Sequence, residues 1–197
     1  MCIRDRTRTD LGLPEDKHIF ILQGSGINVD RGAEEAVQSM QYLENSLLLI
    51  IGGGDVYDSL QDLVQVHNLA DKVRFYSRMP YEKMMEYTAL SDLGLSLDKD
   101  ANINYRFSLP NKLFDYMHAG IPVLSSVVVE VAKIVSDYNI GLVADSHDPE
   151  HLASCAKKIL SPDFTNNQLK DRLEKASGEL CWENERAALI KVLEEID

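Results

Sequence analysis

Two patterns of apolar residues alternate along this chain. Short runs rich in Ile, Val and Leu are typical of parallel strands that are covered on both faces. They predict strands at 19–23, 47–51, 73–76, 93–97, 122–125 and 141–144. Between them, apolar residues three or four positions apart predict helices at 31–43, 55–67, 81–90, 111–119 and 129–137. This alternation predicts an α/β fold with a doubly wound, parallel, six-stranded Rossmann-like sheet.

The end of the chain has a helical pattern only. Asp-Pro-Glu at 148–150 supplies a capping residue, a first-turn proline and a favourably placed acid, so we expect a helix from there to about Leu160. Beyond Pro162, two helical stretches are predicted to join near Gly178. The second stretch has an apolar stripe formed by Trp182, Ala188, Leu189 and Val192.

These patterns divide the chain into three parts. We expect an N-terminal leader or linker at 1–17, a Rossmann-like domain at 18–162 and a C-terminal helical tail at 163–197. The first six residues, MCIRDR, resemble a translated adapter sequence found at the ends of metagenome-assembled reading frames. They are set aside in the fold prediction, and we expect the natural protein to extend upstream.

Composition narrows the classes of partner. The 197 residues carry 20 Lys+Arg and 32 Asp+Glu, a formal net charge of −12, which argues against a general nucleic-acid or anionic-membrane binder. Any phosphate must therefore be held locally. The three cysteines are widely spaced without a C-x-x-C, which favours a reducing compartment, the cytoplasm. No apolar run has the length of a membrane span, although peripheral association of the intact protein with a membrane stays open.

The loops that follow the strands carry the candidate chemistry, because ligands of doubly wound sheets bind at the carboxyl ends of the strands. Gly24 and Gly26 follow the first strand, and Arg31 follows them at the predicted start of a helix. Val29 stands where a G-x-G-x-x-G motif needs its third glycine, and glycines at 52–54 replace the acid of an NAD site. NAD is therefore disfavoured, and simple tight turns remain an alternative explanation for the glycines.

Five basic residues lie in or beside strand-to-helix loops of this acidic chain. They are Arg31, Arg78, Lys99, Arg106 and Lys112. For Lys99 a solvated surface position is the preferred interpretation. A cluster of such cations around one cleft would suit a ligand with two phosphates.

The segment at 105–126 is the most informative. Lys112 and Asp115 lie three positions apart on one face of a predicted helix. They could offer a cation to phosphate and a carboxylate to hydroxyl groups, or they could form an ordinary surface ion pair with each other. The residues alone leave both interpretations open. For His147 and His151 a helical metal pair is disfavoured, because the predicted helix begins between them.

Four segments together resemble a known family. In order, FILQGSGINVDRGAEEAV, LLLIIGGGD, KVRFYSRMPYEKMMEYTALSDLGL and SLPNKLFDYMHAGIPVLSS are similar to the C-terminal half of family 4 glycosyltransferases of the GT-B fold. The resemblance covers roughly residues 10–160. It implies that the chain is the domain that binds the nucleotide-sugar donor, that the N-terminal acceptor domain is missing, and that the chain alone does not catalyse transfer.

The resemblance also implies roles for individual residues. Arg31 and Lys112 would be the catalytic cations that stabilise the departing diphosphate. The implied donor-binding residues are Gly24 and Gly26 under the diphosphate, Arg78 and Met79 at the base, Asp115 at the ribose, and Glu130 after the next strand. Phe107 departs from the family pattern, because an acid is usual at its position.

The implied function is that of a retaining glycosyltransferase. The nucleotide sugar, UDP- or GDP-linked, would be a substrate, and no metal or other cofactor is expected. Two alternatives remain: a nucleotide-sugar 2-epimerase, which shares the GT-B fold, and a non-catalytic nucleotide-binding module, which the Phe107 departure suggests.

Overall fold

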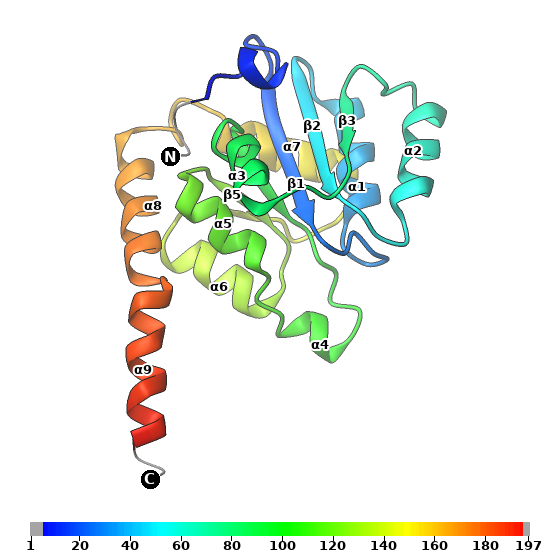
Figure 1. Ribbon diagram of the computed structural model, residues 1–197. Coiled ribbons are helices and arrows are strands. Elements are labelled where there is room, and N and C mark those ends of the chain that lie inside the picture. Colours follow the sequence, from blue (N-terminus) through cyan, green and yellow to red (C-terminus); the bar gives the residue numbers. More distant parts are fainter. Residues whose placement is uncertain (1–5, 195–197) are drawn as a thin grey trace.

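A six-stranded parallel sheet forms the centre of the computed structural model, which describes residues 6–194 without the side chains of 167, 187, 188 and 192–194 (Figure 1). The strand order is β3-β2-β1-β4-β5-β6. The strands are β1 (His18–Gly24), β2 (Ser46–Gly52), β3 (Val73–Tyr76), β4 (Leu93–Ser96), β5 (Val123–Ser125) and β6 (Gly141–Val143). This sheet confirms the predicted fold class. Of the six residues set aside at the start of the sequence, 1–5 lie outside the described range.

Helices connect the strands and cover the sheet. The α-helices are α1 (Ala33–Ser39), α2 (Tyr57–Val66), α3 (Tyr81–Ala89), α4 (Ile103–Arg106), α5 (Asn111–Ala119), α6 (Val129–Asp137), α7 (Pro149–Ile159), α8 (Asn167–Glu179) and α9 (Trp182–Glu194). Two short 3-10 helices, η2 (Thr9–Leu11) and η3 (Met40–Tyr42), complete the described elements. The helix expected at 31–43 is divided between α1 and η3 and begins two residues later than predicted. The four-residue α4 was not predicted.

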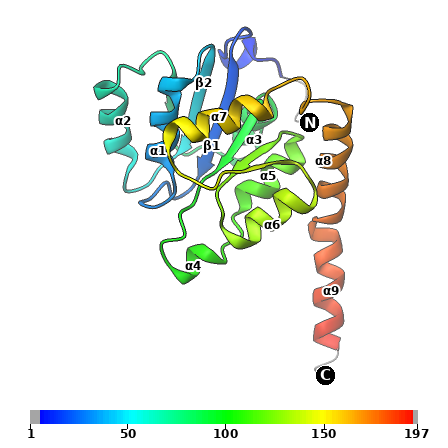
Figure 2. The ribbon, with the colours of Figure 1, turned by 180° about the vertical axis from the view of Figure 1, so that it is seen from behind.

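Alternate residues of the central strands supply two separate cores. Phe20 and Leu22 of β1 face one core, whereas Ile19 and Ile21 face the other. The first core includes residues of α1, α2 and α7, and the second includes residues of α3, α5, α6 and α8. Figures 1 and 2 show these two layers of helices on opposite faces of the sheet. Burial of both faces explains why the strands are almost continuously apolar.

Tyr116 fixes α5 on the sheet. Its side chain is fully buried, and its hydroxyl lies 3.2 Å from the carbonyl oxygens of both Ile21 and Leu95. The ring packs directly on Gly94 of β4, where a Cβ atom would overlap it. Only a glycine leaves this space, and the contact therefore sets the height of α5 above the sheet.

The two C-terminal helices differ in their surroundings. Leu169, Leu173 and Ala176 of α8 are buried in the second core, and α8 continues through Gly178 instead of ending before it. Helix α9 extends beyond the rest of the structure (Figure 1). Of its predicted apolar stripe, Trp182 and Leu189 are exposed, whereas the side chains at 188 and 192 lie outside the described part. No helix in the range 6–194 combines the length and hydropathy needed to cross a membrane.

Candidate functional site

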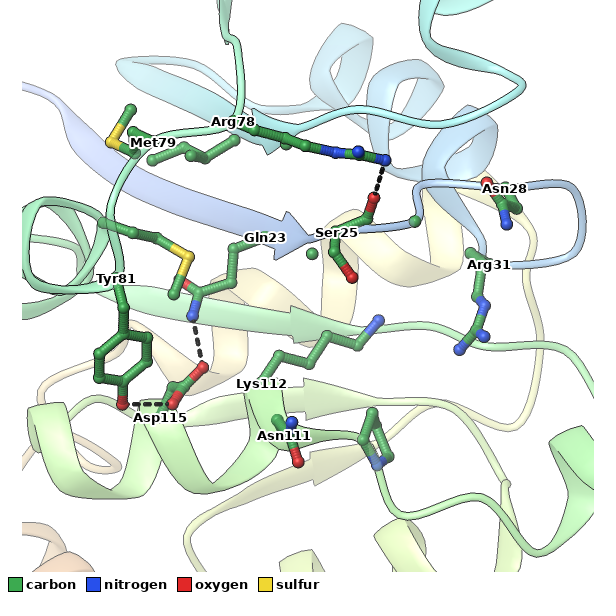
Figure 3. Close-up of a pocket in the computed structure, with 16 residues that line it drawn as sticks. Gln23, Ser25, Asn28, Arg31, Arg78, Met79, Tyr81, Asn111, Lys112 and Asp115 are labelled. Carbon is green, nitrogen blue, oxygen red and sulfur yellow. Dashed lines mark hydrogen bonds between the residues drawn. The ribbon is translucent and has the colours of Figure 1, made fainter.

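A cavity of about 500 Å³ opens at the carboxyl ends of β1 and β2. It is lined by the loops that follow β1, β2 and β3 and by the start of α5 (Figure 3). The strand order changes direction between β1 and β4, beside this cavity. Ligands of doubly wound sheets bind at such a position.

Arg31 and Lys112 line one end of the cavity, and the Asp98 carboxylate pairs with both of them from outside the lining; we call these three residues the cation end. Arg31 Nη1 lies 3.0 Å from Asp98 Oδ1, and Lys112 Nζ lies 3.2 Å from Asp98 Oδ2. Arg31 comes from the loop before α1, Lys112 from the first turn of α5 and Asp98 from the loop after β4. The Arg31 guanidinium also lies over the Tyr105 ring, 4.5 Å from its centroid.

The two cations respond differently to this environment. For Arg31, burial alone would lower the pKa, but the nearby Asp98 carboxylate outweighs burial and the pKa is raised. For Lys112, burial dominates, and its pKa is lowered although Asp98 opposes the change. Arg31 therefore stays charged, whereas the charge of Lys112 depends on the balance between its burial and the Asp98 carboxylate.

Gly32 allows Arg31 to reach Asp98. Its φ angle is +70°, in the left-handed region, and a Cβ atom here would overlap the carbonyl of Leu97, the residue before Asp98. The loop before α1 and the loop after β4 can approach each other only because this residue is a glycine. The Arg-Gly pair in the sequence thus has a local structural cause.

Hydrogen bonds build the opposite end of the cavity, which we call the carboxylate end: Asp115, Tyr81, Gln23 and Thr88. The Tyr81 hydroxyl donates to Asp115 Oδ1 at 2.8 Å, and Gln23 Nε2 donates to Asp115 Oδ2 at 2.9 Å (Figure 3). Behind them, the Thr88 hydroxyl donates to Gln23 Oε1 at 2.6 Å. In this series of three hydrogen bonds each donor faces an acceptor, and this sets the orientation of the Gln23 amide.

Burial raises the pKa of Asp115, while the hydrogen bonds from Tyr81 and Gln23 partly offset the increase. Burial and the Asp115 carboxylate together raise the pKa of Tyr81 to about 12. The Tyr81 hydroxyl therefore keeps its proton as a donor near neutral pH. An ionised carboxylate has about four acceptor positions, so Asp115 can accept further hydrogen bonds from a ligand in the cavity.

Arg78 and Met79 lie on a third side, in the loop after β3 (Figure 3). An Arg78 Nη2 group donates to the Ser25 carbonyl oxygen across the cavity rim. Met79 and Met84 supply apolar surface beside Tyr81. Such apolar lining is typical of pockets that bind small molecules.

Most predicted site residues meet at this one cavity. Those in its lining are Gly24, Gly26, Arg31, Arg78, Met79, Lys112 and Asp115. Glu130 is not in the lining and lies in the first turn of α6. The cavity therefore does not include Glu130, which was predicted to contact the nucleotide-sugar donor. The ligand roles of the other residues remain predictions.

The five-cation cluster is smaller than expected. Lys99, whose side chain is 33% exposed, agrees with the surface position preferred for it and pairs with Glu35 at 2.7 Å, and Arg106 pairs with Asp100 at 2.9 Å. Neither cation lines the cavity. The alternative of an ion pair between Lys112 and Asp115 is also wrong, because Lys112 pairs with Asp98.

His147 and His151 have separate local partners. His147 Nε2 lies 2.9 Å from the Leu97 carbonyl oxygen, and His151 Nε2 lies 2.9 Å from Asp145 Oδ1. In the described part of the chain, no group of three or more His, Cys, Asp or Glu side chains is arranged to hold a metal ion.

Sequence reasoning missed three contributors: Asp98, Gln23 and Tyr81. Asp98 and Gln23 stand at the ends of apolar strands, where a polar residue with 1% or 2% exposure needs a partner. That position was the available signal. Asp98 pairs with Arg31 across 67 residues of sequence, and Gln23 pairs with Asp115 across 92, so the pattern could not identify these partners.

The fold and the cavity define a Rossmann-like α/β domain of the kind found in GT-B proteins. The sequence matches the family described as glycosyl transferases group 1 over residues 3–177. Because this match spans most of the chain, the protein belongs to the group 1 glycosyl transferase family.

Two curated relatives and one solved structure illustrate the match. The chain is 24% identical to D-inositol 3-phosphate glycosyltransferase of Xylanimonas cellulosilytica, covering 96% of this chain and 45% of that protein. It is 25% identical to lipopolysaccharide glucosyltransferase WaaG of Escherichia coli, covering 80% of this chain and 41% of that protein. The crystal structure of Anabaena HepE in complex with UDP and glucose superposes with a TM-score of 0.81 at 12% identity, covering 95% of this chain and 51% of that one. The chain thus spans about half the length of the proteins it matches.

Proposed function

We propose that this chain is the donor-binding part of a retaining glycosyltransferase that uses a UDP- or GDP-linked sugar. The observation that carries the proposal is the division of one cavity into two ends. Arg31 and Lys112 face it from the cation end, and Asp115 faces it from the carboxylate end. A nucleoside diphosphate has the matching groups: phosphates at one end of the ribose and hydroxyls on the ribose itself.

In the proposed reaction the bond between the anomeric carbon and the diphosphate oxygen breaks. The departing diphosphate gains negative charge, and Arg31 and Lys112 stabilise it. The acceptor hydroxyl oxygen forms the new bond to the anomeric carbon, and its proton passes to the diphosphate. Asp115 accepts hydrogen bonds from the ribose hydroxyls, and the surface beside Arg78 and Met79 receives the base.

The relatives support this assignment at the level of the class. Two are named as glycosyltransferases, and the HepE structure contains UDP and glucose. Because the chain spans about half the length of these proteins, we propose that the acceptor is bound by a part of the protein beyond this chain.

Nucleotide binding by the chain is the first test. A ligand at 100 times its dissociation constant stabilises a fold by about 2.7 kcal/mol, which a thermal-shift panel of UDP, GDP and ADP detects. We expect stabilisation by UDP or GDP. No stabilisation by any of the three would contradict the donor-site assignment.

Turnover by the full-length enzyme is the second test. The enzyme is incubated with a nucleotide sugar and an extract that contains acceptors. We expect a glycosylated product whose anomeric configuration is retained, as measured by NMR of the product. Epimerised free donor formed without acceptor would identify a 2-epimerase instead. Binding without either reaction would identify a non-catalytic nucleotide-binding module.

A further inference from the structure

Asp98 is an unusual acid in this chain. Of the Asp and Glu residues whose burial is described, Asp98 alone is classed as buried, with 1% exposure. A buried carboxylate is costly unless charges or hydrogen bonds compensate it. In an acidic chain with 32 Asp and Glu residues, this one is placed directly behind the proposed diphosphate site.

The backbone around Asp98 is held on both sides. The Ser126 hydroxyl donates to the Asp98 carbonyl oxygen, and the amide of Lys99 donates to the Asp30 carbonyl oxygen at 2.8 Å. These bonds tie the loop after β4 to the segment after β5 and to the loop before α1. The carboxylate therefore occupies a defined position.

Its two oxygens contact different cations. Oδ1 receives Arg31 Nη1, and Oδ2 lies beside Lys112 Nζ. Because each oxygen contacts one cation, the carboxylate holds the two cationic groups side by side. Arg31 Nε has no hydrogen-bond partner among the described residues, and Arg and Lys together carry eight N–H donors. Asp98 contacts one nitrogen of each cation, and both side chains also line the cavity, with exposed fractions of 28% for Arg31 and 10% for Lys112.

We propose that Asp98 is a positioning residue that holds Arg31 and Lys112 together, both charged, at the wall of the cavity for a nucleoside diphosphate. This inference rests on the proposed function for the identity of the ligand. Asp98 acts through the two cations and does not itself touch the ligand, since a carboxylate repels phosphate.

Lys112 depends on this neighbour more than Arg31 does. Its side chain is 10% exposed, and burial lowers its pKa. The charged groups around its ammonium are Asp98, which favours the proton, and Arg31, which opposes it; Asp115 follows one turn later on the same helix. Removing the charge of Asp98 leaves burial and Arg31 to act together, so Lys112 would lose its proton at a lower pH. Arginine stays protonated in proteins, so this loss affects Lys112 alone.

The test uses Asp98→Asn, which keeps the side-chain shape and removes the charge. UDP and GDP affinities are measured by calorimetry as a function of pH, with Asp100→Asn as the matched control because Asp100 pairs with Arg106 outside the cavity lining. We expect Asp98→Asn to weaken binding roughly tenfold or more and to begin its alkaline loss of affinity at lower pH than the wild type. A profile identical to that of the wild type overturns the proposal.

A second variant separates charge from simple structural damage. In Lys112→Arg/Asp98→Asn, the cation cannot lose its proton, and we expect the alkaline loss of affinity to disappear while the weaker neutral-pH binding remains. If the double variant keeps the alkaline shift of Asp98→Asn, Lys112 is not the group through which Asp98 acts. Circular dichroism checks the fold of each variant.

A titration without nucleotide distinguishes this proposal from the proposed function. NMR of the Lys112 side chain is expected to show a lower pKa in Asp98→Asn than in the wild type. If the wild type binds neither UDP nor GDP, the donor-site assignment fails, and this titration still decides whether Asp98 keeps Lys112 charged. If Asp98→Asn does not fold, Asp98→Glu keeps the charge and moves its position: weaker UDP binding with the wild-type Lys112 titration supports positioning, and unchanged UDP binding contradicts it.

Discussion

The cation end and the carboxylate end of the cavity are built by different physical means. At the cation end, the charges of Arg31 and Lys112 converge on one buried acid. At the carboxylate end, the neutral donors Tyr81 and Gln23 surround Asp115. Charge attracts phosphate with little demand on angle, whereas hydrogen bonds select hydroxyl groups by direction. The two ends are therefore expected to fail in different ways when they are altered.

The largest effect is expected from the cation end. Arg31→Ala in the full-length enzyme should lower turnover about a hundredfold. The substitution removes the guanidinium that stabilises the negative charge developing on the diphosphate in the transition state. Turnover at saturating donor measures the effect. Arg106→Ala is the matched control, since Arg106 pairs with Asp100 and does not line the cavity. Near-normal turnover of Arg31→Ala would contradict the proposed role of Arg31 in the reaction.

Gly32→Ala should damage the cation end through the backbone. The new Cβ would overlap the Leu97 carbonyl at a φ of +70°, and we expect a loss of about 2 to 4 kcal/mol in the free energy of unfolding. Denaturant unfolding measures this loss. The same substitution at Gly178 in α8 meets no atom within 4 Å and should change stability by no more than about 1 kcal/mol. Equal effects at both positions would show that the close approach beside Asp98 is not important.

Asp115→Asn tests the carboxylate end alone. We expect UDP affinity to fall about tenfold, because hydrogen bonds between the carboxylate and the ribose hydroxyls are weakened. Calorimetry with UDP and with 2′,3′-dideoxy-UDP measures both the loss and its cause. The wild type should prefer UDP, and the variant should hardly distinguish the two ligands. A variant that still discriminates would place the ribose elsewhere.

The pH dependence separates the two ends without a change of ligand. Burial raises the pKa of Asp115 above its ordinary value of 3.8, so its carboxyl takes up a proton earlier as the pH falls, and donor affinity should fall with it. Burial lowers the pKa of Lys112, so affinity should fall as the pH rises through that pKa. Calorimetry with a UDP-sugar should show both limbs. Asp115→Asn is expected to remove the acid limb only, and loss of the alkaline limb in that variant would contradict the division.

Tyr81→Phe should have the smallest effect. It removes one neutral hydrogen bond to Asp115 and leaves the one from Gln23, so UDP affinity should fall about threefold. Tyr42→Phe, at a partly exposed tyrosine of η3 away from the cavity, should leave affinity unchanged. A loss as large as that of Asp115→Asn would mean that Tyr81 contacts the nucleotide directly.

The fold could be predicted because each strand carries its own signal. Four consecutive apolar residues in β1 and five in β2 indicate strands buried on both faces without any knowledge of the neighbours. The helix at 31–43 was less accurate, since the left-handed conformation of Gly32 delays its start. The short α4 carries no periodic signal at all.

The site could be predicted only in part. Arg31, Lys112 and Asp115 were found because they follow strands or open a helix and because the surrounding segments resemble a known family. Asp98 and Gln23 were missed, since their roles arise from pairing with residues of other elements, such as Lys112 and Asp115 of α5. A pattern along the chain contains the need for a partner but not the identity of that partner.

The central position of β1 has a consequence for synthesis of the protein. One edge of β1 pairs with β2, but its other edge pairs with β4, and the bond from the Ile19 amide to Asp92 spans 73 residues. At about 5–20 residues per second, a ribosome needs roughly 4–15 seconds to make that interval. During this time the edge of β1 that pairs with β4 has unpaired backbone N–H and C=O groups and is open to other strands. We therefore expect elongation through residues 19–92 to be the interval in which the nascent chain most needs protection by a chaperone.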